Sequence, residues 1–170
     1  FDSDAYPPEY RDKLYMGNIH GNCINCDALE RDGSTYLAKP RPDFLSTDDA
    51  WFMPVAQKTG PDGCLYVLDW YDSYHCYQDA RADPQGIERQ RGRLYRIRYQ
   101  DSPRASEFDL GRETSAQLVE RLASPNVYFR STATRLLSER NDPQVRERLE
   151  SLVLSGPAEP EAAEQKTRMH

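Results

Sequence analysis

Residues 60–72 read GPDGCLYVLDWYD, and this stretch decides the fold class predicted for the chain. The Pro-Asp-Gly triplet favours a tight turn, because glycine tolerates a positive φ. The run at 65–68 is rich in strand formers and is too short for a confident helix. We therefore predict an inner strand of a sheet, which delivers the carboxylates of Asp69 and Asp72 to a loop.

The composition limits the classes of protein to which the chain can belong. Its 170 residues are enough for one ordinary domain or two small ones. The formal charge of -6 argues against a nucleic-acid partner, since phosphate binding needs clustered Lys and Arg. No run approaches the roughly 18 apolar residues that a membrane span requires, so no span is predicted. The acidic opening, FDSD, lacks the pattern of a signal peptide.

Further strand patterns precede and follow the 60–72 stretch. Leu14-Tyr15-Met16 resembles Leu65-Tyr66-Val67, 51 residues later, and this spacing lies near the upper end of propeller-blade periods. Breaks are expected at the Asp32-Gly33 turn and at Pro40-Arg41-Pro42. The predicted strands are 13–19, 23–29, 35–38, 52–58, 65–68 and 92–99, the last with one polar, Arg-rich face.

The sequence pattern changes from strand to helix after residue 99. Residues 100–113 are polar and are interpreted as a linker. A helix then begins at Thr114, which forms a capping box with Gln117, and it stops before Pro125.

Two more helices are predicted after the first. The second covers about 127–140 and is capped by Asn126, and the third has Asp142 as its cap and Pro143 at its first position. Three short amphipathic helices in succession suggest a helical-repeat array. The Glu- and Ala-rich tail at 156–170 is predicted to be disordered.

The four cysteines raise the question of a zinc or redox site. Cys23 and Cys26 have metal-ligand spacing, but in a strand their thiols point to opposite faces, which favours unpaired thiols over a metal quartet. A disulfide between Cys23 and Cys76 stays open as an alternative. A haem-attachment C-x-x-C-H is excluded, because Asp27 follows Cys26.

Several motifs in this order resemble one family. They are LYMGNIHGNCIN (14–25), LERDGSTY (29–36), DFL (43–45), GPDGCLYVLDWYD and GRLYRI (92–97), followed by LVERLASPNVYFRSTATRLLSER (118–140). Over roughly residues 6–155 the chain resembles the last propeller blades and the HEAT-like repeats of the planctomycete-type "membrane-bound dehydrogenase domain" proteins. Their propellers are relatives of the soluble glucose/sorbosone dehydrogenases. Family members often have basic residues at positions 23 and 26, where this chain has cysteines.

The resemblance implies a mainly β fold followed by α structure. Residues 1–99 would form an incomplete β-propeller of about two blades, 100–113 a linker, and 114–155 a HEAT-like, armadillo-type repeat. It also implies PQQ and Ca²⁺ as cofactors and a periplasmic or other extracytoplasmic location. Haem is not carried over from the family, because this chain lacks the C-x-x-C-H motif. Because propellers close with roughly four to eight blades, the fragment would be inactive alone and prone to association.

Propeller geometry would place the candidate site residues on one rim. These are His20, Asn22, Asp48, Asp49, Trp51, Asp69, Asp72 and His75. His20 is the candidate general base, or else a structural histidine bonded to a carbonyl. The four aspartates, Asp48, Asp49, Asp69 and Asp72, are candidate Ca²⁺ ligands. The alternative for Asp69 and Asp72 is that one caps a turn and the other pairs with an arginine.

Aromatic and basic residues complete the predicted rim. Asn22, Trp51, Arg91 and Arg93 are the candidate cofactor-binding residues, since guanidinium groups bind quinone carboxylates by paired hydrogen bonds. Trp51, Trp70 and Tyr71 stack on a sugar or quinone in one interpretation, and pack blade against blade in the other.

Two functions follow from these patterns. The first is the C-terminal fragment of a quinoprotein-type sugar or alcohol dehydrogenase, inactive alone, working by base-assisted hydride transfer to a quinone. The second is a non-catalytic propeller and HEAT module that binds a polysaccharide or a protein partner, the latter through its helices.

Overall fold

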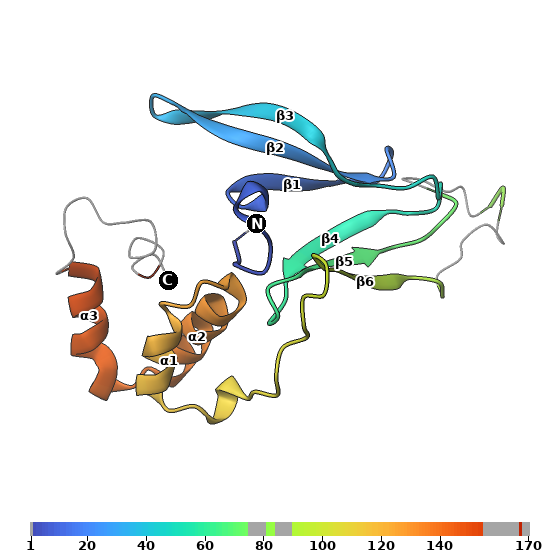
Figure 1. Cartoon of the computed structure of the whole chain (residues 1–170). Coiled ribbons are helices and arrows are strands. Elements are labelled where there is room, and N and C mark those ends of the chain that lie inside the picture. Colours follow the sequence, from blue (N-terminus) through green and yellow to red (C-terminus); the bar gives the residue numbers. More distant parts are fainter. Residues whose placement is uncertain (1, 75–80, 84–89, 155–166, 168–170) are drawn as a thin grey trace. The chain divides into compact units, whose positions relative to one another are not determined.

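The structure is a computed structural model that describes residues 2–74, 81–83, 90–154 and 167 (Figure 1). The chain divides into two compact units. A β unit comprises Ala5–Gly60 and Cys64–Ser102. A helical unit contains Asp2–Asp4, Pro61–Gly63 and the chain from Pro103 onward. The prediction of β structure followed by α structure is confirmed.

The described part of the β unit holds two antiparallel three-stranded sheets. The first has the order β1-β2-β3 and the second the order β4-β5-β6 (Figure 1). A short 3₁₀ helix, η1 (Pro8–Tyr10), precedes β1. The strand bounds are β1 Lys13–Asn18, β2 Cys23–Asp32, β3 Thr35–Ser46, β4 Pro54–Thr59, β5 Leu65–Asp69 and β6 Arg93–Ile97. The predicted inner strand of the 60–72 stretch is therefore β5, the central strand of the second sheet.

The core of the β unit is built from alternate residues of these strands. Leu65 and Val67 of β5 are buried, whereas Leu68 between Val67 and Asp69 is exposed. They pack in one cluster with Ile24 of β2 and with Phe52, which precedes β4. The two sheets thus share a core through one face of each.

Gly17 allows β1 to lie close to β4. A Cβ atom at this position would lie 2.1 Å from the carbonyl oxygen of Pro54. No side chain can be accommodated at that distance unless the backbone shifts. The glycine is therefore a packing requirement of the β unit, although φ at this residue is not positive.

Two predicted features of the sheets were wrong. The break at Pro40-Arg41-Pro42 does not occur, and β3 runs through both prolines. An edge strand tolerates proline, because its outer N–H groups need no partner within the sheet. The arginines of β6 also do not share a face, since Arg93 lies opposite Asp69 while Arg96 lies opposite Tyr66, three residues earlier in β5.

The helices begin where the sequence predicts. Thr114 and Gln117 form the capping box of α1 (Ser115–Arg121). Asn126 caps α2 (Val127–Arg140) through a bond from the N–H of Tyr128. The third helix differs in its first turn, which is the 3₁₀ helix η3 (Pro143–Val145) ahead of α3 (Arg146–Leu154).

The core of the helical unit includes a residue from the 100–113 segment, which was predicted to be a linker. Leu110 is buried in the 3₁₀ helix η2 (Leu110–Arg112), inside the 100–113 stretch. It packs in one cluster with residues of the later helices, among them Leu118, Ala133 and Leu137. A single buried leucine in a polar segment gives no periodicity by which it can be found.

The helical unit also contains two segments that are distant in sequence. Arg130 of α2 is only 1 % exposed, donates to the carbonyl of Ser124 at 2.6 Å, and pairs with the carboxylate of Asp2. Asn126 donates to the carbonyl of Pro61 at 3.1 Å. A piece limited to 114–155 would lose both contacts. The predicted disordered tail, 156–170, lies outside the described residues except for Thr167.

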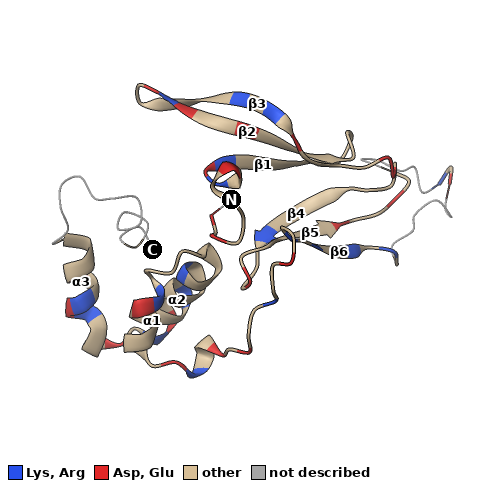
Figure 2. Ribbon diagram, in the orientation of Figure 1, with Lys and Arg blue, Asp and Glu red and all other residues tan. Residues whose placement is uncertain are grey.

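Acidic and basic residues lie next to one another on α1 and α3 (Figure 2). A membrane span requires a long and apolar helix. Among the described residues, no helix is long and apolar enough to cross a membrane.

Candidate functional site

The candidate site lies at the end of the β unit where β1 stops and β4 starts. Asn22, in the turn between β1 and β2, donates its side-chain amide to the carbonyls of Ala50 and Phe52 at 3.1 and 2.9 Å. The N–H of Thr47 donates to the carbonyl of Asn22 at 3.3 Å. These bonds join the turn after β1 to the connection that leads into β4.

Asp69 is a buried residue that binds two backbone N–H groups of the site. It is 1 % exposed, and its Oδ1 accepts from the N–H of Met53 at 2.8 Å and from that of Tyr71 at 3.0 Å. Its Oδ2 has no hydrogen-bond partner among the residues described. The carboxylate therefore ties the residue before β4 to the residues after β5.

Two residues of the site have left-handed backbone conformations. The φ angle is 50° at Asn22 and 53° at Tyr71. Asparagine tolerates this region, but an aromatic residue there is a true outlier. Such conformations cost on the order of 1–3 kcal/mol, and they cluster at functional sites. The bond from the Tyr71 N–H to Asp69 helps to hold this strained geometry.

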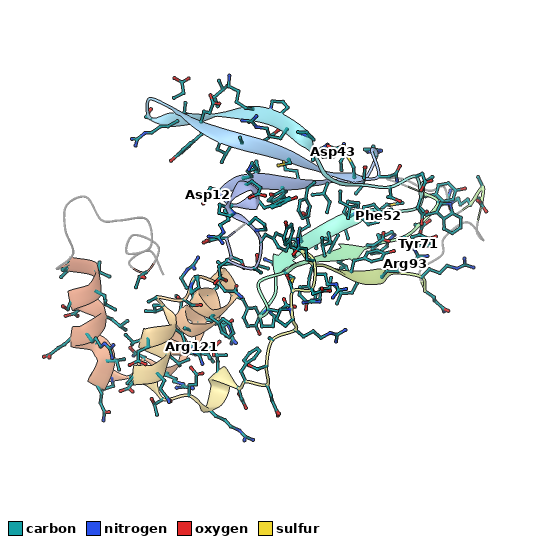
Figure 3. All side chains as sticks on the ribbon, in the orientation of Figure 1. Asp12, Asp43, Phe52, Tyr71, Arg93 and Arg121 are labelled. Carbon is teal, nitrogen blue, oxygen red and sulfur yellow. The ribbon has the colours of Figure 1, made fainter. Side chains whose placement is uncertain are left out.

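Arginine and aromatic side chains alternate at the surface above Asp69. The guanidinium carbon of Arg93 lies 3.4 Å from the ring centroid of Tyr71. Figure 3 labels these two neighbouring side chains. The rings of Tyr71 and Trp51 are 5.5 Å apart, and Arg91 lies 6.0 Å from the Trp51 ring. We call Trp51, Tyr71, Arg91 and Arg93 the arginine–aromatic cluster.

Two neighbouring side chains, those of Asp49 and Tyr95, bind the guanidinium of Arg93. Asp49 lies 3.6 Å from Arg93, and its other carboxylate oxygen accepts from the N–H of Trp51 at 3.1 Å. Arg93 also donates to the hydroxyl of Tyr95 at 3.0 Å, and this bond raises the pKa of Arg93. The two contacts fix the orientation of the guanidinium, which is charged at physiological pH as in any arginine.

The structure brings together the four predicted cofactor-binding residues. Trp51, Arg91 and Arg93 are in the cluster, and Asn22 holds the backbone on either side of Trp51. Tyr95 was missed. Alternation in β6 places it on the same face as Arg93, and that pattern was the available signal.

The four candidate Ca²⁺ ligands do not form one set. Asp69 accepts backbone N–H groups, Asp72 accepts from the N–H of Tyr74 at 3.1 Å, Asp49 pairs with Arg93, and Asp48 is exposed. Both Asp69 and Asp72 act as turn caps. In the part of the chain that the structure describes, no three acidic, His or Cys side chains gather to hold a metal ion.

His20 lies in the same turn as Asn22 and is exposed. Its backbone N–H donates to the side chain of Asn18 at 3.1 Å. The turn places it at the predicted end of the sheets, while its role as a base stays a prediction. His75 lies outside the described residues.

Cys23 and Cys26 are buried free thiols with different neighbours. Cys23 accepts from the amide of Asn25 at 3.4 Å, whereas Cys26 lies opposite Tyr15 in the sheet. Burial raises the pKa of both thiols, so neither is a reactive thiolate at neutral pH. Cys76, the proposed disulfide partner of Cys23, lies outside the described residues.

The two guanidinium groups are hydrogen-bond donors of the arginine–aromatic cluster. Guanidinium groups donate paired hydrogen bonds to carboxylates, and the half-buried ring of Trp51 lies between Tyr71 and Arg91. The donors present are thus of the type that binds carboxylates, such as those of a quinone cofactor, or hydroxyl groups.

A family model with the description "Domain of unknown function (DUF7133)" matches residues 1–101. The chain belongs to this family. The match ends within one residue of the end of the β unit at Ser102, so every residue of the candidate site lies inside the DUF7133 region. No curated protein and no solved structure matches the chain.

Proposed function

We propose that the β unit binds a sugar ring at the arginine–aromatic cluster, as the C-terminal, catalytically incomplete part of a quinoprotein-type sugar or alcohol dehydrogenase. The observation that carries this proposal is the stack of Arg93 on Tyr71, held at a strained backbone beside Trp51. Such strain is expected where a side chain must be aimed at a ligand.

The proposed fold of the parent protein is a β-propeller with HEAT-like repeats in an extracytoplasmic compartment. Two consecutive antiparallel sheets that share a core support the propeller part, because blades pack face to face in the same way. The three successive helices support the repeat part.

The chemistry of the cluster suits a carbohydrate. A pyranose presents C–H groups to an aromatic ring and hydroxyls to surrounding donors and acceptors. Trp51 supplies the ring, Arg93 supplies donors, and Asp49 supplies an acceptor. A quinone bound at the same guanidinium groups would supply the hydride acceptor for sugar oxidation.

Intrinsic fluorescence tests the binding directly. The chain has two tryptophans, and Trp70→Phe leaves Trp51 as the sole reporter. Titration of this variant with a panel of monosaccharides, and separately with PQQ, should change the Trp51 emission with saturation. Trp70→Phe/Arg93→Ala should lose the response. An unchanged spectrum with every sugar and with PQQ would contradict the proposal.

A binding module without catalysis is the second candidate. It is favoured by the dispersal of the candidate metal carboxylates among other partners. Dye reduction with PQQ and a sugar panel, with and without Ca²⁺, should show no turnover for this chain. Turnover by a longer protein that contains it would support the dehydrogenase. Glycan binding without turnover in that protein would support the module.

A further inference from the structure

An exposed apolar row crosses the outer face of the second sheet. Ala56 of β4 lies opposite Leu68 of β5, which in turn lies opposite Leu94 of β6. Leu68 is 47 % exposed and Leu94 is 67 % exposed. The opposite face of the same sheet is buried, because Leu65 and Val67 pack in the core of the β unit. In the described part of the β unit, one face of this sheet therefore packs against the first sheet, and the other is exposed at Leu68 and Leu94.

Basic residues flank the apolar row. The next cross-strand row along the sheet contains Lys58, Tyr66 and Arg96. Lys58 is exposed. The outer face of the second sheet thus combines an apolar half with a basic half, and a complementary surface would combine apolar with acidic residues.

The outer face of the first sheet has that complementary character. Leu14 and Met16 of β1 are 42 % and 38 % exposed. Leu14 lies opposite Asp27 of β2, and Met16 lies opposite Asn25, whose amide binds Asp43. Apolar and acidic groups therefore lie side by side on this face. The chain thus carries two surfaces of complementary character.

We propose that the outer face of the second sheet binds the outer face of the first sheet of another copy of this chain. The contact would extend, between molecules, the face-to-face packing that already joins the two sheets within one molecule. Because the two surfaces differ, the contact is head-to-tail and each copy can bind a neighbour on either side. The proposal goes beyond the sugar site and does not depend on ligand binding.

Mass measurement by light scattering tests the contact on the full chain. The mass should rise above the 19.6 kDa of one chain as the concentration increases. Leu94→Glu should weaken association by about tenfold or more, as loss of a central interface residue does. Leu154→Glu is the matched control, since Leu154 is 78 % exposed on α3 of the helical unit. It should leave the mass unchanged, and far-UV circular dichroism verifies that each variant is folded.

A charge exchange identifies the two surfaces independently. Lys58→Glu and Asp27→Lys should each weaken association, and the double variant should restore it, because each interface then regains an opposite pair. A monomer at all concentrations would overturn the proposal. So would association that survives Leu94→Glu, or that is lost in Leu154→Glu, since the helical unit would then provide the contact. Failure of the double variant to recover would show that the first sheet is not the partner surface.

Discussion

The guanidinium carbon of Arg93 lies 3.4 Å above the ring centroid of Tyr71, although 21 residues separate them in the chain. Strand β5 leads into Tyr71 and strand β6 begins at Arg93, so pairing of these two strands brings the groups together. Asp69 supports the stack because it fixes the N–H of Tyr71.

Arg93→Lys tests the stack. Lysine keeps the charge but cannot lie flat on the ring, so the free energy of unfolding should fall measurably. Urea unfolding measures this change. Arg98→Lys, at an exposed pair with Asp101, should have no measurable effect. Equal stability of the two variants would show that the stack contributes nothing.

Asp69→Ala tests the buried carboxylate. The change removes the acceptor for the N–H groups of Met53 and Tyr71, so it should destabilise the β unit by about 2–4 kcal/mol. Asp69→Asn retains one carbonyl oxygen and removes the charge, and it should be much closer to the wild type. If chemical denaturation shows that Asp69→Asn is as unstable as Asp69→Ala, then the charge of Asp69 has a role that these two hydrogen bonds do not explain.

Gly17→Ala tests the approach of β1 to β4. The added methyl group would meet the carbonyl oxygen of Pro54 at 2.1 Å, and overpacking of this kind typically costs about 1–3 kcal/mol. Gly92→Ala is the control, since its nearest contact would be an ordinary 3.4 Å. Thermal melting of both variants gives the comparison. A Gly17→Ala variant as stable as Gly92→Ala would mean that the strands can separate without loss.

Asp2→Asn tests the pair with Arg130. Arg130 is buried, so weakening its partner should lower the stability of the helical unit by about 1–3 kcal/mol. Glu139→Gln, which breaks the exposed pair with Arg135, should cost no more than about 0.5 kcal/mol. Hydrogen exchange of α2 amides reports the helical unit separately from the β unit. Unchanged exchange in Asp2→Asn would remove residue 2 from the helical core.

The stability of the helical unit should depend on pH because of Asp142. Hydrogen bonds from the Ser115 side chain and from the N–H of Gln144 lower its pKa below the ordinary 3.8. A lowered pKa in the folded state means that the stabilisation is fully present above about pH 4 and is lost as the pH falls through the folded pKa. The stability difference between wild type and Asp142→Asn should therefore shrink as the pH is lowered below 3.8. A difference independent of pH would contradict this.

The sequence predicted most of the local structure. Capping side chains act over two or three residues, so the starts of α1 and α2 at Thr114 and Asn126 follow from the sequence alone. The same holds for the turn before β5. The path of β3 through Pro40 could not be predicted, because it depends on β3 being an edge strand, which only the pairing reveals.

By itself, the sequence determined which residue types are available near the end of β5: two carboxylates, aromatic rings and arginines, on strands with clear boundaries. Only the tertiary structure decided what they do. Strand pairing placed Arg93 on Tyr71, and the side chains of the buried Asp69 and Asp72 accept hydrogen bonds from backbone N–H groups. The physical reason is that a buried carboxylate must be solvated by hydrogen bonds, and which donors reach it depends on segments that meet only when the sheets pack.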